Sequence, residues 1–222
     1  MGNYSWMKCI LEKDTDPISD KQKAVIKAAV ELFSEKGYAA TSTREIAIRA
    51  GVAEGTIFKQ YPTKKDLMLR ITERIINTAL FPLVSSGISG LLEKPFKNRE
   101  EFLAAFLQNR MDLMQDGIPL FKIIFQEMPF QPEIRAMLVR QIKKIPLAAV
   151  VKKLREEGSP GSSASGASGN DFSEAELTQI LLTCISGFFI LRNIMAPELF
   201  PKTRLKKDAS ALVRFINKGM SL

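Results

Sequence analysis

The chain has 222 residues, 45% of them hydrophobic, which is enough for one large or two modest domains with an apolar core. Its net charge of +8 favours polyanionic partners, either nucleic acid or a membrane surface. Histidine is absent, which excludes Ser-His and Cys-His nucleophile pairs and histidine-containing zinc sites, so we expect no enzyme, no catalytic residue, no metal and no cofactor.

The amino-terminal part is predicted to be a loose arm followed by a helix. Residues 1–17 show no sustained hydrophobic periodicity, so we expect an arm without regular structure. Ser19 and Gln22 then form a capping box, which predicts a helix that runs to about Lys36 and is ended by Gly37. The inward-facing residues of this helix recur at helical spacing: Val25, Ile26, Ala29, Leu32 and Phe33.

Two short helices joined by a glycine turn come next. Ser42 caps a helix that begins at Thr43, because Glu45 lies three residues on and reaches back to the cap amide. Gly51 ends this helix, since glycine adopts the left-handed conformation without strain. A second short helix is predicted over residues 54–60, and its exposed side is the candidate reader of DNA.

A third capping box, Thr63 with Asp66, starts a longer helix. Residues 42–67 also carry a set of small, apolar and basic side chains at fixed spacing: Thr43, Ile46, Ala47, Ala50, Gly51, Val52, Gly55, Thr56, Ile57, Phe58, Tyr61, Thr63, Lys64 and Leu67. This set resembles the helix-turn-helix of the tetracycline-repressor (TetR) family of transcriptional regulators. The resemblance extends back over the preceding helix and covers roughly residues 20–68, with further matches at Ala29, Phe33, Gly37 and Tyr38.

The resemblance implies that the exposed sides of these helices bind DNA. Arg44, Lys59 and Lys64 fall at helix ends, where side chains and backbone amides face phosphates together. The expected DNA contacts are Thr43, Arg44, Gly55, Thr56, Phe58, Lys59, Gln60, Tyr61 and Lys64. Two positions depart from the family pattern, because Phe58 replaces a tyrosine that contacts phosphate and Ala53 replaces a capping serine. A missing cap costs about 0.5–2 kcal/mol, which lowers the expected affinity without changing the fold.

Further helices are predicted up to residue 157. The long helix after the helix-turn-helix is expected to stop near residue 78 or 80, before Pro82. An amphipathic helix follows over about residues 98–115, and then an apolar segment over 118–130 between two prolines. A longer helix over about residues 132–157 is predicted to kink at Pro146, because proline removes one backbone hydrogen bond.

The carboxy-terminal part is predicted to contain a linker and two helices. Residues 158–170 are rich in Gly and Ser, which predicts a flexible linker. Asp171 or Ser173 starts a strongly apolar helix that ends before Pro197, and a last helix spans about residues 204–218. Apolar groups on more than one face suit a helix that is buried by its own domain and by a second subunit. The predicted dimer interface is Leu177, Leu181, Ile185, Phe189, Leu212 and Ile216.

No stretch shows the alternation typical of strands, so the predicted fold is all-α with about nine helices. We expect an arm over residues 1–17, a helix-turn-helix DNA-binding domain over 18–66, and a helical ligand-binding and dimerisation domain over 67–222. The family resemblance implies the same architecture.

The predicted function is a homodimeric, sequence-specific regulator of transcription. The resemblance implies a repressor that a small molecule releases from a palindromic, double-stranded operator. A pocket for a hydrophobic or aromatic compound, cationic ones included, is expected among Phe102, Phe106, Arg110, Met111, Met114, Phe121, Phe125 and Phe188, with Arg110 as the polar anchor. The plainer interpretation of these side chains is core packing.

Two other classes of function stay open at this point. The Lys-rich helix ends and Met/Phe faces also suit a basic helical protein that binds an acidic membrane or a partner protein, and the carboxy-terminal helices suit a small-molecule carrier or enzyme. The two cysteines, Cys9 and Cys184, lie far apart and form no paired framework. Neither a signal peptide nor an apolar run of about 18 residues is evident, so a prokaryotic cytoplasmic protein without a membrane span is expected, associated with the nucleoid when bound to DNA.

Overall fold

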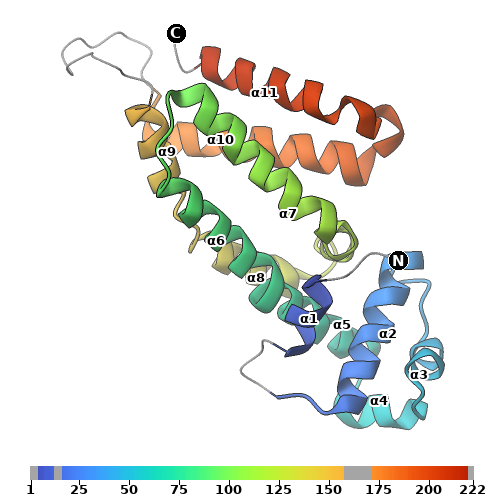
Figure 1. Ribbon diagram of the computed structural model, residues 1–222. Coiled ribbons are helices and arrows are strands. Elements are labelled where there is room, and N and C mark those ends of the chain that lie inside the picture. Colours follow the sequence, from blue (N-terminus) through green and yellow to red (C-terminus); the bar gives the residue numbers. More distant parts are fainter. Residues whose placement is uncertain (1–4, 13–16, 158–171, 220–222) are drawn as a thin grey trace. The chain divides into compact units, whose positions relative to one another are not determined.

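The computed structural model describes residues 5–12, 17–157 and 172–219, and every regular element within them is a helix (Figure 1). The all-α prediction is confirmed, with eleven α-helices in the described part of the chain. Their bounds are α1 Ser5–Glu12, α2 Asp20–Lys36, α3 Thr43–Ala50, α4 Glu54–Gln60, α5 Lys64–Arg74, α6 Phe81–Leu92, α7 Arg99–Glu127, α8 Pro132–Ile142, α9 Leu147–Glu156, α10 Glu174–Ile190 and α11 Leu205–Gly219. The π-helices η1 (Ile75–Leu80) and η2 (Leu191–Met195) extend α5 and α10, and two 3-10 turns, η3 (Pro197–Leu199) and η4 (Lys202–Arg204), precede α11. The predicted linker over 158–170 lies outside the described residues.

The helices form two compact units. Unit 1 comprises Met1–Leu83 and Gln115–Lys144, and unit 2 comprises Val84–Met114 and Ile145–Leu222. The helix-turn-helix therefore shares a unit with α5 and α8, a division that differs from the boundary expected at residues 66 and 67. Lys65 Nζ donates to Glu133 Oε1 at 2.8 Å, which joins the first turn of α5 to α8. This contact links residues far apart in sequence, so local patterns do not reveal it.

The amino-terminal segment is ordered where the sequence predicted a loose arm. Residues Ser5–Glu12 form α1, so the prediction is wrong for this segment, while the rest of the arm up to residue 16 lies outside the described residues. Arg74, which is fully buried, donates from Nε to the Ile10 carbonyl oxygen at 2.9 Å and satisfies an end-of-helix acceptor. The helix also buries its apolar side chains Trp6, Met7, Cys9 and Ile10. Tertiary contacts, rather than local periodicity, order this segment.

The long helix after the helix-turn-helix continues through Pro82, against the prediction that it stops there. The run α5–η1–α6 is helical from Lys64 to Leu92. In η1 the Phe81 N–H bonds to the Ile76 carbonyl, five residues back instead of four. Proline breaks an α-helix because its ring crowds the carbonyl four residues back. The wider π turn immediately before Pro82 relieves that crowding, and the helix goes on.

Two further predictions at prolines are corrected. Helix α7 passes through Pro119 and ends at Glu127, where a helix end near residue 115 was expected. Four side chains that follow this proline are buried: Leu120, Phe121, Ile123 and Ile124. Their burial stabilises the fold by about 1.5–3 kcal/mol per side chain, which outweighs the cost of about 3 kcal/mol for an internal proline. At Pro146 the chain breaks instead of kinking, so α8 and α9 are separate helices. Pro146 has ψ 59°, and the Leu147 N–H bonds to the Ile145 carbonyl at 2.8 Å in a tight turn.

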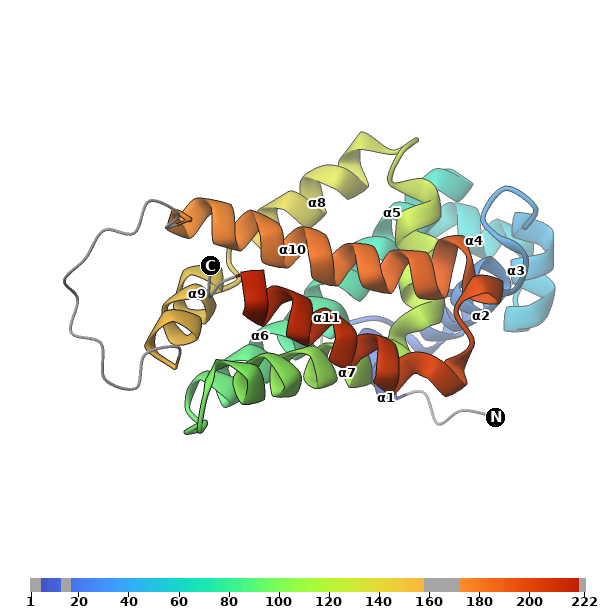
Figure 2. The same cartoon turned by 90° about the horizontal axis from the view of Figure 1, so that it is seen from above.

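The core of unit 2 lies between α6, α7, α9, α10 and α11. Of the two predicted starts of α10, Ser173 is the cap, and its Oγ accepts from the Glu176 N–H at 3.2 Å. Figures 1 and 2 show α10 and α11 side by side. Their inward faces meet the first half of α7 in one apolar cluster, which includes Phe102, Leu103, Phe106, Leu154, Leu181 and Val213.

Two helical stretches in the described residues, Lys64–Leu92 and Glu174–Met195, are long and apolar enough to cross a membrane by length and composition alone. This corrects the expectation that no such segment exists. Core helices of soluble proteins meet the same criterion, and the first stretch buries Leu67, Met68, Ile71, Ile75 and Ile76 within unit 1.

Candidate nucleic-acid interface

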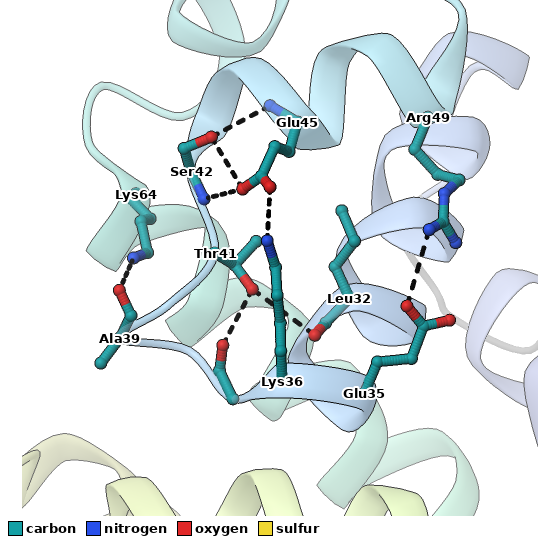
Figure 3. Close-up of polar contacts among 10 residues, drawn as sticks. Leu32, Glu35, Lys36, Ala39, Thr41, Ser42, Glu45, Arg49 and Lys64 are labelled. Carbon is teal, nitrogen blue, oxygen red and sulfur yellow. Dashed lines mark hydrogen bonds and ion pairs between the residues drawn. The ribbon is translucent and has the colours of Figure 1, made fainter.

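The helix-turn-helix has the local geometry that its caps predict. Ser42 Oγ accepts from the Glu45 N–H at 3.2 Å, and the Glu45 carboxylate accepts from the Ser42 N–H at 2.8 Å (Figure 3). Gly51 adopts φ 67° and ψ 33°, the left-handed conformation that ends α3. The Val52 N–H bonds back to the Ala47 carbonyl at 3.0 Å and closes the turn. The capping box therefore fixes the start of α3, and backbone hydrogen bonds at Gly51 and Val52 close the corner between α3 and α4.

Helix α4 is fixed to α3 by a contact that the sequence analysis did not identify. Thr43 Oγ1 donates to Glu54 Oε1 at 2.6 Å, from the first residue of α3 to the first residue of α4. Ile57 is buried beneath α4, and Ala53 provides no side-chain cap, as its sequence predicts. Thr43 therefore has a positioning role between the two helices in addition to its expected contact with DNA. In the sequence, only the position of Glu54 at the start of the predicted second helix points to this Thr43–Glu54 contact.

The residues expected to contact DNA differ in solvent exposure. Arg44 on α3 and Gly55, Phe58, Lys59 and Gln60 on α4 are exposed, whereas Thr43, Thr56 and Lys64 are half-buried. Tyr61 is only 7% exposed, and burial raises the pKa of its phenol. We correct the expectation for Tyr61, which packs beneath the end of α4 instead of presenting its side chain to DNA.

Lys64 lies at the start of α5, against α2 and the loop after it. Its Nζ is 4.2 Å from the centre of the Tyr38 ring and donates to the Ala39 carbonyl oxygen at 3.4 Å (Figure 3). Partial burial lowers the pKa of the Lys64 ammonium, and partial burial, with the nearby Glu127 carboxylate, raises the pKa of the Tyr38 phenol. These contacts hold the ammonium group at the end of α5 that adjoins the helix-turn-helix.

Helices α2 and α3 are joined by ion pairs (Figure 3). Lys36 donates to Glu45, and this contact, followed by the Ser42 amide, lowers the pKa of the Glu45 carboxyl to about 2. Arg49 at the end of α3 lies 3.5 Å from the carboxylates of both Glu31 and Glu35 on α2. Arg49 is therefore neutralised within the protein, whereas Arg44 on the same helix has no ion pair among the described residues. The unpaired guanidinium is the one available to a phosphate or a base.

The loop between α2 and α3 contains a buried hydroxyl. Thr41 is fully enclosed, and its Oγ1 donates to the Gly37 carbonyl oxygen at 2.8 Å. Gly37 has a positive φ of 86°, so the chain leaves α2 in a conformation that an L side chain resists. Thr41 thereby ties the entry of the helix-turn-helix to the end of α2.

The predicted dimer-interface residues turn inward. Leu177, Leu181 and Ile216 are buried in the core of unit 2, and Ile185 and Leu212 pack partly against the same core. Phe189 is also buried, at 7% exposure. The assignment is therefore wrong for the four buried residues, whereas Ile185 and Leu212, which are half-buried, stay predictions. Helix α10 is apolar on several faces, so periodicity alone does not say which face points into its own domain.

The predicted pocket residues are divided between the two units. Phe102, Phe106 and Met111 belong to the core of unit 2, and Phe188 packs partly against it. Phe121 and Phe125 lie in unit 1, where their rings stack with centroids 6.2 Å apart. The Met114 side chain is not among those that the structure describes. Burial of Phe102, Phe106 and Met111 agrees with core packing, and the predicted pocket stays a prediction. Arg110, a buried cation in unit 2, stands apart from them.

Comparison with known proteins agrees with this geometry. The family model for bacterial regulatory proteins of the tetR family matches residues 25–71, which include α3, α4 and most of α2 and α5. The chain is 26% identical to the HTH-type transcriptional regulator YvkB of Bacillus subtilis over 195 residues, covering 86% of this chain and 93% of that one. Relatives of this kind are named as HTH-type transcriptional regulators, which agrees with the expectation of a regulator instead of an enzyme.

Two solved structures have the same fold along most of their length. A transcriptional regulator from Saccharomonospora viridis in complex with choline aligns with a TM-score of 0.63 at 17% identity, covering 92% of this chain and 97% of that one. The regulator FadR from Bacillus subtilis in complex with stearoyl-CoA aligns with a TM-score of 0.60 at 20% identity, covering 88% and 97%. With a family match over the helix-turn-helix and a relative aligned along nearly the whole chain, the protein belongs to the TetR family of helix-turn-helix transcriptional regulators.

Proposed function

We propose that the protein is a homodimeric repressor that binds a palindromic, double-stranded operator and leaves it when a small molecule binds. The observation that carries this proposal is the exposed, unpaired Arg44 on α3, together with exposed Lys59 and Gln60 on α4. Side chains of this kind at a helix-turn-helix contact phosphates and base edges in the major groove. We assign DNA binding to residues 18–66, and effector binding and dimerisation to residues 67–222. Its place of action is the bacterial cytoplasm, on the nucleoid.

The dimer interface is assigned to the outward face of α10, in place of the buried residues predicted from the sequence. A single helix-turn-helix offers few contacts, whereas a two-fold dimer places two readers about 34–36 Å apart, one turn of DNA. Small, polar and apolar residues recur along this face at spacings of three and four: Ala175, Gln179, Leu182, Thr183 and Ser186. Leu182 is 39% exposed, and Phe215 on the neighbouring α11 is 71% exposed. Covering such side chains with a second subunit contributes about 1.5–3 kcal/mol each when burial is complete.

Charge substitution tests this face. Leu182→Glu and Phe215→Glu are expected to give monomers by light scattering at micromolar concentration, because each places a carboxylate in the proposed interface. Val139→Glu on α8 is the matched control, since Val139 is also an exposed apolar side chain, outside α10 and α11. A monomeric wild type, or dimers that survive both substitutions, would reject the assignment.

Effector binding is supported by the two ligand-bound regulators of the same fold, one holding choline and the other stearoyl-CoA. A ligand changes DNA affinity only through a difference in its affinity for the two states of the protein, and a tenfold change needs about 1.4 kcal/mol. Linkage also requires that DNA weakens the binding of any ligand that weakens DNA binding.

Selection of bound fragments from genomic DNA tests the proposed function as a whole. Recovery of a palindromic sequence that retains the protein in a gel at moderate salt supports an operator-binding regulator. Flotation on anionic vesicles, run in parallel, tests the basic membrane-binding alternative, for which the outward face of Glu174–Met195 is the relevant apolar surface. Flotation without sequence-dependent retention on DNA would reject the proposal.

A further inference from the structure

Arg110, on the part of α7 that lies in unit 2, is a buried cation without an anion. It is only 7% exposed. Its Nη1 and Nη2 both donate to the Val84 carbonyl oxygen at 3.3 Å, and Nη2 also donates to the side-chain oxygen of Asn109. All of these acceptors are neutral, and no carboxylate lies within ion-pair distance of Arg110 among the described residues. Nε is buried and has no hydrogen-bond partner.

A second buried arginine in unit 2 shows the contrasting arrangement. Arg192 is 5% exposed, and its guanidinium forms an ion pair with Asp208 at 2.8 Å and donates to the Pro201 carbonyl oxygen at 2.6 Å. Arg192 therefore has the partner that a buried charge requires in order to be stable. Arg110 lacks it, and burial lowers the pKa of its guanidinium to about 10. An unpaired buried charge destabilises a folded protein, so a need for that charge in binding explains its presence better than packing does.

The backbone of α6 leaves room for this guanidinium. A Cβ atom on Gly87 would lie 2.7 Å from Arg110 Nη2 and 2.7 Å from Asn109 Oδ1, closer than real Cβ atoms approach. An alanine here would therefore displace the ends of these two side chains, and with them the guanidinium at the Val84 carbonyl. The other neighbour is apolar, since the guanidinium carbon is 5.5 Å from the centre of the Phe106 ring.

We propose that Arg110 is the anion anchor of the effector site, and that the effector is a small amphiphile with a carboxylate or phosphate head and an apolar tail. This inference rests on the proposed ligand response and specifies the class of ligand. A guanidinium with unused donors binds a carboxylate or phosphate through charge-assisted hydrogen bonds. The apolar surroundings, which include Phe106 and the core of unit 2, favour an apolar tail. The same positive charge repels cations, so cationic effectors are dropped from the earlier expectation.

The test compares four probes of equal chain length, namely decanoate, decyl phosphate, decanol and decyltrimethylammonium, below their micelle concentrations and without DNA. Calorimetry and thermal unfolding are expected to show binding of at least one anion to the wild type, at least tenfold tighter than decanol and the ammonium compound. The difference between decanoate and decyl phosphate identifies the head group. Absence of binding by both anions, or equal binding of all four probes, overturns the proposal.

Three variants separate ligand binding from packing. Arg110→Met is expected to raise the Tm of the ligand-free protein and to abolish the anion-induced rise in Tm, whereas Arg192→Met, the matched control, lowers the Tm and keeps the anion-induced rise. Gly87→Ala retains the charge but displaces the guanidinium, so its anion affinity should fall at least tenfold. An Arg110→Met protein that binds the anions like the wild type refutes the inference. Operator retention is measured separately on the same preparations, so a failure of DNA binding rejects the proposed function without affecting the anion result.

Discussion

Replacing Arg44 by alanine tests which side of α3 faces DNA. Arg44 is exposed and has no ion pair among the described residues, so its charge is available to a phosphate or a base edge. One phosphate contact contributes about 0.9 to the slope of log affinity against log salt, so its loss from both protomers of a dimer lowers the slope by about 1.8. Between 50 and 200 mM salt, the wild-type affinity should therefore fall about twelvefold more than that of the variant. If Arg44 instead contacts a base, Arg44→Ala costs about 1–3 kcal/mol per site and relaxes specificity at one base pair.

Arg49→Ala is the matched control for this experiment. It removes one positive charge from the same helix, but Arg49 already lies 3.5 Å from both Glu31 and Glu35. We expect a smaller effect of Arg49→Ala on the salt slope, measured by fluorescence anisotropy on a labelled operator across a salt series. Equal losses in the two variants would show that net charge alone matters, and an unchanged slope and specificity in Arg44→Ala would refute the contact.

Three further predictions concern the junction of α2, α3 and α5. Thr41→Val removes a buried hydroxyl that bonds to the Gly37 carbonyl at 2.8 Å and should lower the free energy of unfolding by about 1–3 kcal/mol in urea, whereas an unchanged midpoint would show that the bond contributes nothing. Because the Glu45 pKa is lowered to about 2, its contribution to stability is present above its ordinary pKa of 4.5 and is lost as the pH falls from there towards 2. Glu45→Gln, which keeps a capping side chain, should therefore lose less stability than the wild type over that range, and parallel pH profiles would contradict this. Lys64→Ala should weaken binding to all DNA sequences alike and lower the salt slope by about one charge per protomer, so a loss confined to a single operator would exclude a phosphate contact.

Caps and turns are the features of this fold that the sequence predicts best. The capping boxes predicted at Ser19, Ser42 and Thr63 are all present, and Gly51 has the predicted left-handed conformation. Ser173, one of the two predicted starts of α10, also forms a capping box. Each of these features depends on residues three or four positions apart, so the sequence contains all the relevant information. The boundaries of the helix-turn-helix follow from them.

Features that depend on distant residues were not predictable. Helix α1 is ordered by burial and by the bond from Arg74 to the Ile10 carbonyl, which joins residues 64 positions apart. Pro82 is tolerated because a π turn precedes it, and no local pattern announces such a turn. The inward face of α10 was misassigned because the helix is apolar on several sides. The positioning contact between Thr43 and Glu54 likewise appears only when α3 and α4 are placed together.

The ties between α5 and the rest of unit 1 limit how a ligand response reaches DNA. The Lys65–Glu133 ion pair joins α5 to α8, but both side chains are more than 40% exposed, and such a pair contributes about 0.2–1 kcal/mol. A tenfold change in operator affinity requires about 1.4 kcal/mol, more than this pair supplies on its own. Leu67, Met68 and Ile71 of α5 are fully buried, and shifting them changes packing worth several times as much. Breaking the surface pair alone is therefore too small a change for the proposed tenfold response, whereas a shift of the buried face of α5, and with it Lys64 at the start of that helix, is large enough.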